Sequence, residues 1–268
     1  MSKNLYIVPY DFTSVTAKAV EYALFLGRKV STEIRLVHIA KDKATAISKV
    51  KELENVKNKL EIPAGLLVTT HVSVGDIFVD IGRIATELNA QLIIMGTHGL
   101  KGKQYLFGGN AMKILKSVNT PFLIVQDSSE IKEISGLLVP IDLTKESMQI
   151  ISIAGDMSNI LKAKVNVITE KQSDDMLKVR IKNRLGIVKS EYEDRGISAN
   201  IEYVPHKGAY DAKIIDYSLK NDIGLIAIAY HSESLFPQFD NFAQKLITNK
   251  PAIPVLIVNS KLASALYF

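Results

Sequence analysis

Short apolar runs alternate along this chain with longer amphipathic or charged stretches. In the first half the runs of strand length are Leu5–Val8, Ile34–Ile39, Leu66–Val74, Leu92–Met95 and Phe122–Val125. The stretches between them predict helices from Thr13 or Ser14 to about Gly27, then over Ala44–Leu60, Asp76–Leu88 and Ala111–Val118. The last two runs are apolar at successive positions, as in strands that helices cover on both faces. This order predicts an α/β fold with a parallel sheet and right-handed crossovers.

The second half of the chain repeats the first. Val8–Thr13 reappears as Val139–Thr144, and Thr120–Val125 reappears as Ile253–Val258, with the intervening matches in the same order. A short polar stretch, Asp127–Glu130, separates the copies. Ordered matches at nearly constant spacing indicate a duplication.

The duplication predicts two tandem domains, residues 1–128 and 132–268, each of a usual domain size. We expect each to be Rossmann-like, with a mostly parallel five-stranded sheet flanked by helices. Ligands of such sheets bind outside the carboxyl ends of the strands. Pro9 and Asp11 follow the first strand, and Gly96 follows the fourth. We therefore expect the functional residues at this rim of the sheet.

The loop after the fourth strand carries the spacing Gly96-x2-Gly99-x9-Gly109-Asn110, and a predicted helix follows. Glycine lets a backbone approach an anion closely and adopt positive φ. A helix N-terminus presents free N–H groups and the positive end of a dipole. The pattern thus predicts an anion site, to which Lys101 and Lys103 add charge; a flexible surface loop is the alternative. Neither a Gly-Lys-Ser/Thr sequence nor GxGxxG is present, so this is neither a P-loop nor a dinucleotide fingerprint.

Composition and charge narrow the classes of function. The 268 residues carry a net charge of +5 and include no cysteine, which excludes disulfides, thiolate metal sites and cysteine catalysis. The charges are dispersed, so we expect no nucleic-acid partner. No apolar run reaches the roughly 18–20 residues that span a bilayer. Pro9 and Asp11 end the N-terminal apolar run too early for a signal peptide, and we expect a cytoplasmic protein without a membrane partner.

The motifs together resemble a known family. Pro-x-Asp after the first strand, Leu36-Val37-His38-Ile39 in the second, and Met95-Gly96-Thr97-His98-Gly99-x9-Gly before the last helix look like the universal stress protein family. Gly-x2-Gly-x9-Gly-Ser/Thr is the ATP-binding signature of that family. The resemblance covers the whole chain as a tandem two-domain member. It implies the adenine nucleotide α-hydrolase-like form of the Rossmann-like fold.

The resemblance also implies a site for ATP or a related adenine nucleotide in domain 1, with or without Mg²⁺. In ATP-binding members, the positions of Asp11, in its Pro9-x-Asp11 motif, and Ile39 hold the adenine. Those of Met95, Gly96 and Gly99 line the ribose and phosphates, and those of Gly109, Asn110 and Ala111 bind phosphate at the helix N-terminus. Asn110 stands where the family has Ser or Thr; it can cap a helix but lacks the hydroxyl.

The second copy departs from the signature. Ala229–Ser234 replaces the start of the glycine loop, and Asp240–Phe242 stands where Gly108–Asn110 stands in the first copy. A carboxylate there would repel a triphosphate and satisfy the helix N-terminus itself. We therefore expect ATP in domain 1 only.

Three classes of function stay open at this point. The first is a nucleotide-binding stress or signalling protein with slow or no hydrolysis, because no general base is evident beside the loop. The second is an interaction module that needs no nucleotide, and the third is a weak ATPase or nucleotidyl transferase. Asp11 and Asp142 also have a plainer interpretation as residues that fix the turn into a helix.

The last strand of each copy is short and very apolar. By the resemblance, Phe122–Val125 and Val255–Val258 are expected to join the two domains as an intramolecular pseudo-dimer, which would cover both sheet edges. Whether two chains then form a homodimer is left open by the sequence.

Overall fold

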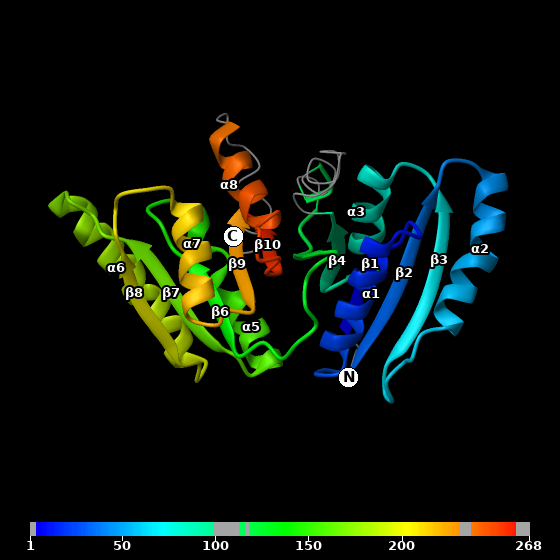
Figure 1. Ribbon diagram of the computed structural model, residues 1–268, viewed down its shortest axis with the longest axis horizontal. Helices are drawn as coiled ribbons and strands as arrows, with labels where there is room; N and C mark the ends of the chain where they lie inside the picture. Colours follow the sequence, from blue (N-terminus) through cyan, green and yellow to red (C-terminus); the bar gives the residue numbers. More distant parts are fainter. Residues whose placement is uncertain (1–3, 99–112, 116–117, 231–236, 261–268) are drawn as a thin grey trace. The chain divides into compact units, whose positions relative to one another are not determined.

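The computed structural model describes residues 4–98, 113–115, 118–230 and 237–260, and the side chains of 237–240 are not considered (Figure 1). The chain divides into two compact units, Met1–Ile131 and Lys132–Phe268. Both units have an α/β fold with a parallel sheet. No helix within the described ranges has the length and apolar character needed to cross a membrane.

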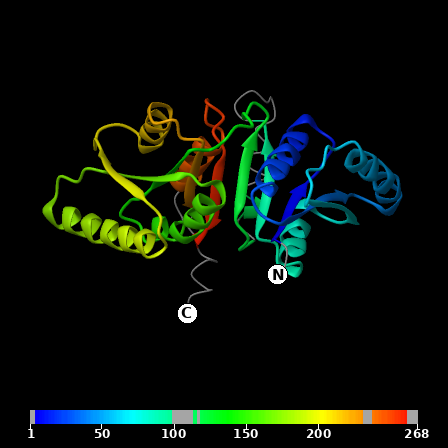
Figure 2. The same ribbon diagram turned by 90° about the horizontal axis from the view of Figure 1, so that it is seen from below.

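The sheet of the first unit has the strand order β3-β2-β1-β4-β5, with every neighbouring pair parallel. Its strands are β1 (Asn4–Pro9), β2 (Thr32–Ala40), β3 (Leu67–Val74), β4 (Leu92–Thr97) and β5 (Phe122–Gln126). Its helices are α1 (Ser14–Gly27), α2 (Lys43–Asn58) and α3 (Ile77–Glu87), and residues 113–115 are also helical. The chain adds β2 and β3 on one side of β1, and then crosses to the other side to add β4 and β5. Because the crossovers are right-handed, this change of side places helices on both faces of the sheet, as Figure 2 shows. The switch point between β1 and β4 is where such sheets bind ligands.

The predicted strands of the first unit are confirmed, with small differences at their ends, of which the one at the end of β4 bears on the site. Every residue of β4 and β5 is buried, in keeping with their uninterrupted apolar sequence. The structure extends β4 past Met95, because Gly96 pairs with Val125 and Thr97 pairs with Gln126. Gly96 is therefore the penultimate residue of a buried strand, where the sequence had placed it in the loop.

The second unit has the equivalent strand order, β8-β7-β6-β9-β10, again parallel. Its strands are β6 (Gly136–Pro140), β7 (Lys164–Glu170), β8 (Ala199–Val204), β9 (Leu225–Tyr230) and β10 (Val255–Asn259). Its helices are α5 (Ile151–Leu161), α6 (Asp175–Asp194), α7 (Tyr210–Lys220) and α8 (Pro237–Ile247), with a 3-10 turn η2 (Glu146–Met148).

The two units differ where their first helices begin. Helix α1 starts at Ser14, directly after the Asp11-Phe12-Thr13 sequence, whereas η2 and a late start at Ile151 replace this first turn in the second unit. Helix α8 starts at Pro237, a residue suited to the first helical position. Asp240, expected before a helix, therefore lies inside the first turn of α8.

Candidate functional site

Asp11 lies at the carboxyl end of β1 and fixes the start of α1. Its Oδ1 accepts hydrogen bonds from the backbone N of Thr13 at 3.1 Å and from the hydroxyls of Thr13 at 2.6 Å and Thr16 at 3.0 Å. Its Oδ2 accepts none from any residue that the structure describes. One carboxylate oxygen is therefore structural, and the other is available to a ligand at the rim.

An aromatic cluster supports the backbone after Asp11. Phe12 has φ 69°, in the left-handed region that a residue with a side chain rarely adopts. Its ring makes edge contacts with Tyr10 at 5.3 Å and His38 at 5.1 Å, and the Nζ of Lys49 lies 4.1 Å from its centroid. Each such contact contributes roughly 0.5–1.5 kcal/mol, which offsets the roughly 1–2 kcal/mol of the left-handed conformation.

Strand pairing brings Pro9, Asp11 and Ile39 to the same edge of the sheet. Pro9 pairs with Val37, so Ile39 stands two residues further along the neighbouring strand. Nδ1 of His38 lies 2.8 Å from the carbonyl oxygen of Tyr10 and ties the two strand ends together. Ile39 is half-buried and thus has part of its side chain open at this rim.

Gly96 has a structural reason to be glycine. A Cβ atom on Gly96 would stand 2.2 Å from the carbonyl oxygen of Val15 and 2.5 Å from its Cγ1, in the first turn of α1. Cβ atoms in proteins almost never approach another heavy atom to within 3.0 Å, so one of the two backbones would have to shift. Met95 beside it is buried, with 5% of its surface exposed. Tight packing of β4 on α1 is therefore sufficient to explain Gly96, whatever ligand the rim holds.

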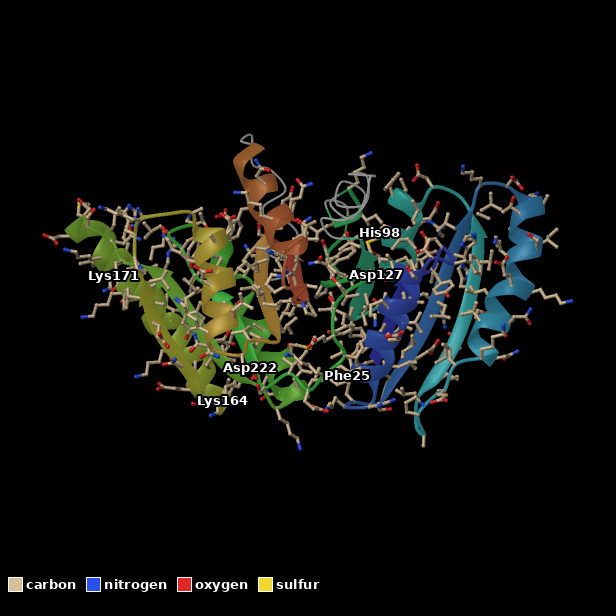
Figure 3. The ribbon with its side chains drawn as sticks, in the orientation of Figure 1. Phe25, His98, Asp127, Lys164, Lys171 and Asp222 are labelled. Carbon is tan, nitrogen blue, oxygen red and sulfur yellow. The ribbon has the colours of Figure 1, made fainter. Side chains whose placement is uncertain are left out.

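The rest of the expected nucleotide site lies outside the described residues. Gly99, Gly109, Asn110 and Ala111 all fall in that part of the loop. His98, the last described residue before it, is half-buried beyond the end of β4 (Figure 3).

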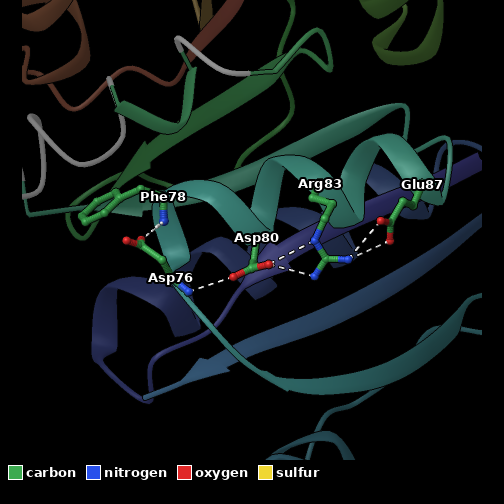
Figure 4. A network of polar contacts seen from close by, with 5 residues as sticks. All are labelled: Asp76, Phe78, Asp80, Arg83 and Glu87. Carbon is green, nitrogen blue, oxygen red and sulfur yellow. Dashed lines mark hydrogen bonds and ion pairs between the residues drawn. The ribbon is translucent and has the colours of Figure 1, made fainter. Parts of the chain in front are cut away.

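The N-termini of α2 and α3 at this rim are occupied by the chain's own carboxylates. Asp42 caps α2 by accepting a hydrogen bond from the N of Thr45 at 2.8 Å, which lowers the pKa of its carboxyl. At α3, Asp76 accepts from the N of Phe78 at 2.7 Å, and Asp80 accepts from the N of Asp76 at 2.8 Å (Figure 4). These ends cannot also attract a phosphate, because negative charge already faces their N–H groups.

Arg83 holds the carboxylate of Asp80 in place. It donates to Oδ1 of Asp80 from Nε at 3.1 Å and Nη2 at 2.8 Å, and from Nη1 to both carboxylate oxygens of Glu87 (Figure 4). The hydrogen bonds from Arg83 lower the pKa of Asp80. The carboxylate at the start of α3 is therefore charged over the ordinary pH range.

The second unit keeps the aspartate and its support. Oδ1 of Asp142 accepts from the backbone N of Thr144 at 2.7 Å and from its hydroxyl. Ser147, at the position equivalent to Thr16, donates to the carbonyl oxygen of Thr144 at 3.0 Å. In both units the aspartate thus accepts from the backbone N and the hydroxyl of the threonine two residues further on, which shows that this part of its role is structural.

Two residues of the second unit that the sequence did not single out occupy the equivalent rim. The hydroxyl of Tyr210 donates to the carbonyl oxygens of Ile168 at 3.0 Å and Ile141 at 3.3 Å. Glu170, at the position equivalent to Ile39, forms an ion pair with Lys213. The sequence contained one indirect sign that Tyr210 lies at this rim. Tyr210 directly follows Gly208 and Ala209, at the position where the first unit has the apolar Ile77.

Among the residues that the structure describes, no group of three or more His, Cys, Asp or Glu side chains is arranged to hold a metal ion.

Comparison with known proteins assigns a family to part of the chain. The model described as "Universal stress protein family" matches residues 6–126. Universal stress protein MJ0577 of Methanocaldococcus jannaschii is 36% identical over 87 residues, which make up 32% of this chain and 52% of that protein. The match thus spans about half the length of the curated relative.

Solved structures extend the likeness to the whole chain at the level of the fold. A universal stress protein from Archaeoglobus fulgidus is 17% identical, with a TM-score of 0.75 over 97% of this chain and 100% of its own. Another from Archaeoglobus fulgidus, solved in complex with dAMP, is 15% identical and covers 48% of this chain and 100% of its own, with a TM-score of 0.39.

Proposed function

Residues 6–126 belong to the universal stress protein family, and from this premise we propose that the first unit binds ATP or a related adenine nucleotide. The site lies at the carboxyl rim of its sheet, between the end of β1 and the loop that follows β4. The observation that carries the proposal is that the family match runs through the whole glycine loop from Gly96 to Asn110.

The described geometry supports this position. Asp11 presents an oxygen without a described partner beside the half-buried Ile39, which suits a hydrogen bond to the base. The starts of α2 and α3 carry their own carboxylates. The helix after the glycine loop differs from α2 and α3, because glycines and Asn110 precede it in the sequence instead of a carboxylate. Its N-terminus is therefore suited to bind a phosphate.

In this proposal Asp11 and Ile39 hold the adenine, with Pro9 fixing the turn. Met95, Gly96 and Gly99 line the ribose and phosphates, and Gly109, Asn110 and Ala111 bind phosphate. The nucleotide acts as a ligand that shifts conformation or assembly in a stress response, and turnover is slow or absent. Domain 2, residues 132–268, does not bind ATP in this mode, because Glu170 replaces Ile39 and Tyr210 occupies the rim.

Calorimetric titration of ATP and of ADP into the intact chain tests the proposal. We expect one site per chain, lost in a variant carrying Gly108→Asp, Gly109→Asn and Asn110→Phe, which gives the loop the sequence of domain 2. Asp11→Asn should weaken binding about tenfold or more, because an interaction with a charged group contributes roughly 1.5–3 kcal/mol. Asp142→Asn is the matched control and should leave binding unchanged. Binding that survives the loop variant would show that the site lies elsewhere.

A further inference from the structure

Lys113 and Lys245 are equivalent lysines before the last strands of the two units, and they differ in their partners. In the second unit, Nζ of Lys245 forms an ion pair with Oδ2 of Asp211 at 3.2 Å. In the first unit, Phe78 stands at the position of Asp211, and Nζ of Lys113 lies 4.9 Å from the centroid of its ring. The lysine therefore faces a carboxylate in the second unit and an aromatic ring in the first.

The side chain of Lys113 is exposed, and no carboxylate of a described residue forms an ion pair with it. The acidic side chains at the start of α3, close to Phe78, have partners within their own helix. Asp76 accepts from the N of Phe78 at 2.7 Å. Asp80 accepts from Arg83 at 2.8 Å and from the N of Asp76 at 2.8 Å (Figure 4). The ring of Phe78 thus attracts the ammonium group through its face without cancelling the charge.

This contact lies at the carboxyl rim of the first sheet. Phe78 is in the first turn of α3, which follows the end of β3 at Val74. Lys113 comes three residues after Asn110, on the helix that follows the glycine loop. A helical side chain leans toward the N-terminus of its helix, and a lysine is long enough to reach back over one turn. The ammonium group of Lys113 is therefore directed toward the end of its helix that carries the glycines.

The strand order sets which part of a nucleotide Lys113 would meet. Asp11 and Ile39, which hold the adenine in the proposed site, follow or end β1 and β2. Lys113 belongs to the segment between β4 and β5, on the other side of β1 from β2. A nucleotide bound across this switch point has its base near β2 and its phosphates near the helix after β4. Lys113 is therefore at the phosphate end of the proposed site.

We propose that Lys113 is a specificity residue of the nucleotide site, which favours ATP and ADP over AMP by pairing with a phosphate beyond the first. The inference rests on the proposed nucleotide site and adds to it a preference for the number of phosphates. A cation–π contact at an exposed position is weak, so the ammonium group exchanges Phe78 for a phosphate oxygen at low cost. In the second unit the carboxylate of Asp211 already pairs with the equivalent Lys245.

Calorimetric titration of ATP, ADP and AMP into the intact chain tests this assignment. We expect Lys113→Gln to weaken ATP binding about fivefold and to change AMP binding by less than about twofold. Lys113→Arg keeps the charge and should keep most of the preference for ATP. Lys245→Gln removes the same charge from the equivalent position of the second unit, and as the matched control it should leave all three affinities unchanged. An unaltered ratio of ATP to AMP affinity in Lys113→Gln would overturn the inference.

A second variant, Phe78→Asp, gives Lys113 the partner that Lys245 has in the second unit. We expect it to reduce the preference for ATP at least as much as Lys113→Gln does, and a folded Phe78→Asp variant with the full preference would contradict the assignment. Circular dichroism checks the folding of each variant. If the unaltered chain binds none of the three nucleotides, the proposed function fails and this inference fails with it. If the unaltered chain binds ATP and AMP equally tightly, this inference alone fails.

Discussion

The carbonyl oxygen of Val15 lies only 2.2 Å from the position that a Cβ atom on Gly96 would occupy. We expect Gly96→Ala to destabilise the chain by about 3 kcal/mol, the upper end of the cost of overpacking, because a helix backbone rather than a flexible side chain must move. Urea denaturation measures the change. Gly186→Ala, in the middle of α6 with no heavy atom within 4 Å of its ideal Cβ, is the control and should stabilise by about 0.5–1 kcal/mol. A Gly96→Ala variant of unchanged stability would show that tight packing does not explain this glycine.

The two equivalent aspartates should have equal structural effects and unequal effects on binding. We expect Asp11→Ala and Asp142→Ala each to cost about 1 kcal/mol, the usual net contribution of a side chain that accepts a hydrogen bond from a backbone N–H group. Thermal unfolding compares the two. If Asp11→Asn keeps the stability of the chain but loses ATP affinity, Oδ2 of Asp11 contacts the ligand. If Asp11→Asn and Asp142→Asn both bind ATP with the affinity of the unaltered chain, the role of Asp11 is structural alone.

His71, on strand β3, predicts a pH dependence. Burial lowers its pKa below 6.5, and the charges of Arg35 and Arg83 lower it further. As pH falls below 6.5, the unfolded chain takes up the proton first, so stability present above that value is lost over the window below it. We expect His71→Gln to reduce the loss of stability between about pH 7.5 and about pH 5.5, measured as the change in urea midpoint. An identical pH profile in the variant would contradict the assignment.

Removal of the Tyr210 hydroxyl should destabilise the second unit. Tyr210→Phe leaves the carbonyl oxygens of Ile168 and Ile141 without this donor, at a cost of about 1 kcal/mol. Tyr203→Phe is the control, because Tyr203 is 45% exposed and its substitution should be close to neutral. Equal stability of the two variants would show that the bridge contributes nothing measurable.

Much of the fold follows from apolar runs of strand length and from the repeated Pro-x-Asp-x-Thr sequence, since both are local signals. The sequence did not predict that Gly96 lies within β4, because the end of that strand depends on its register with β5, a non-local partner. Nor did it predict the left-handed Phe12, which neighbours on β2 and α2 support. At the site, the position of Asp11 was readable from sequence, whereas Tyr210 was not, because it reaches the rim from another helix.

The late start of α5 has a consequence for the residue that the neighbouring strand can carry. In the second unit, Ala229 stands at the position of Gly96, and η2 lies where α1 has its first turn. In the first unit the backbone of that helical turn is what would collide with a methyl group on Gly96. The residue at the end of the fourth strand and the form of the first helix are therefore coupled, and a glycine can be exchanged there at low cost only together with the turn that packs on it.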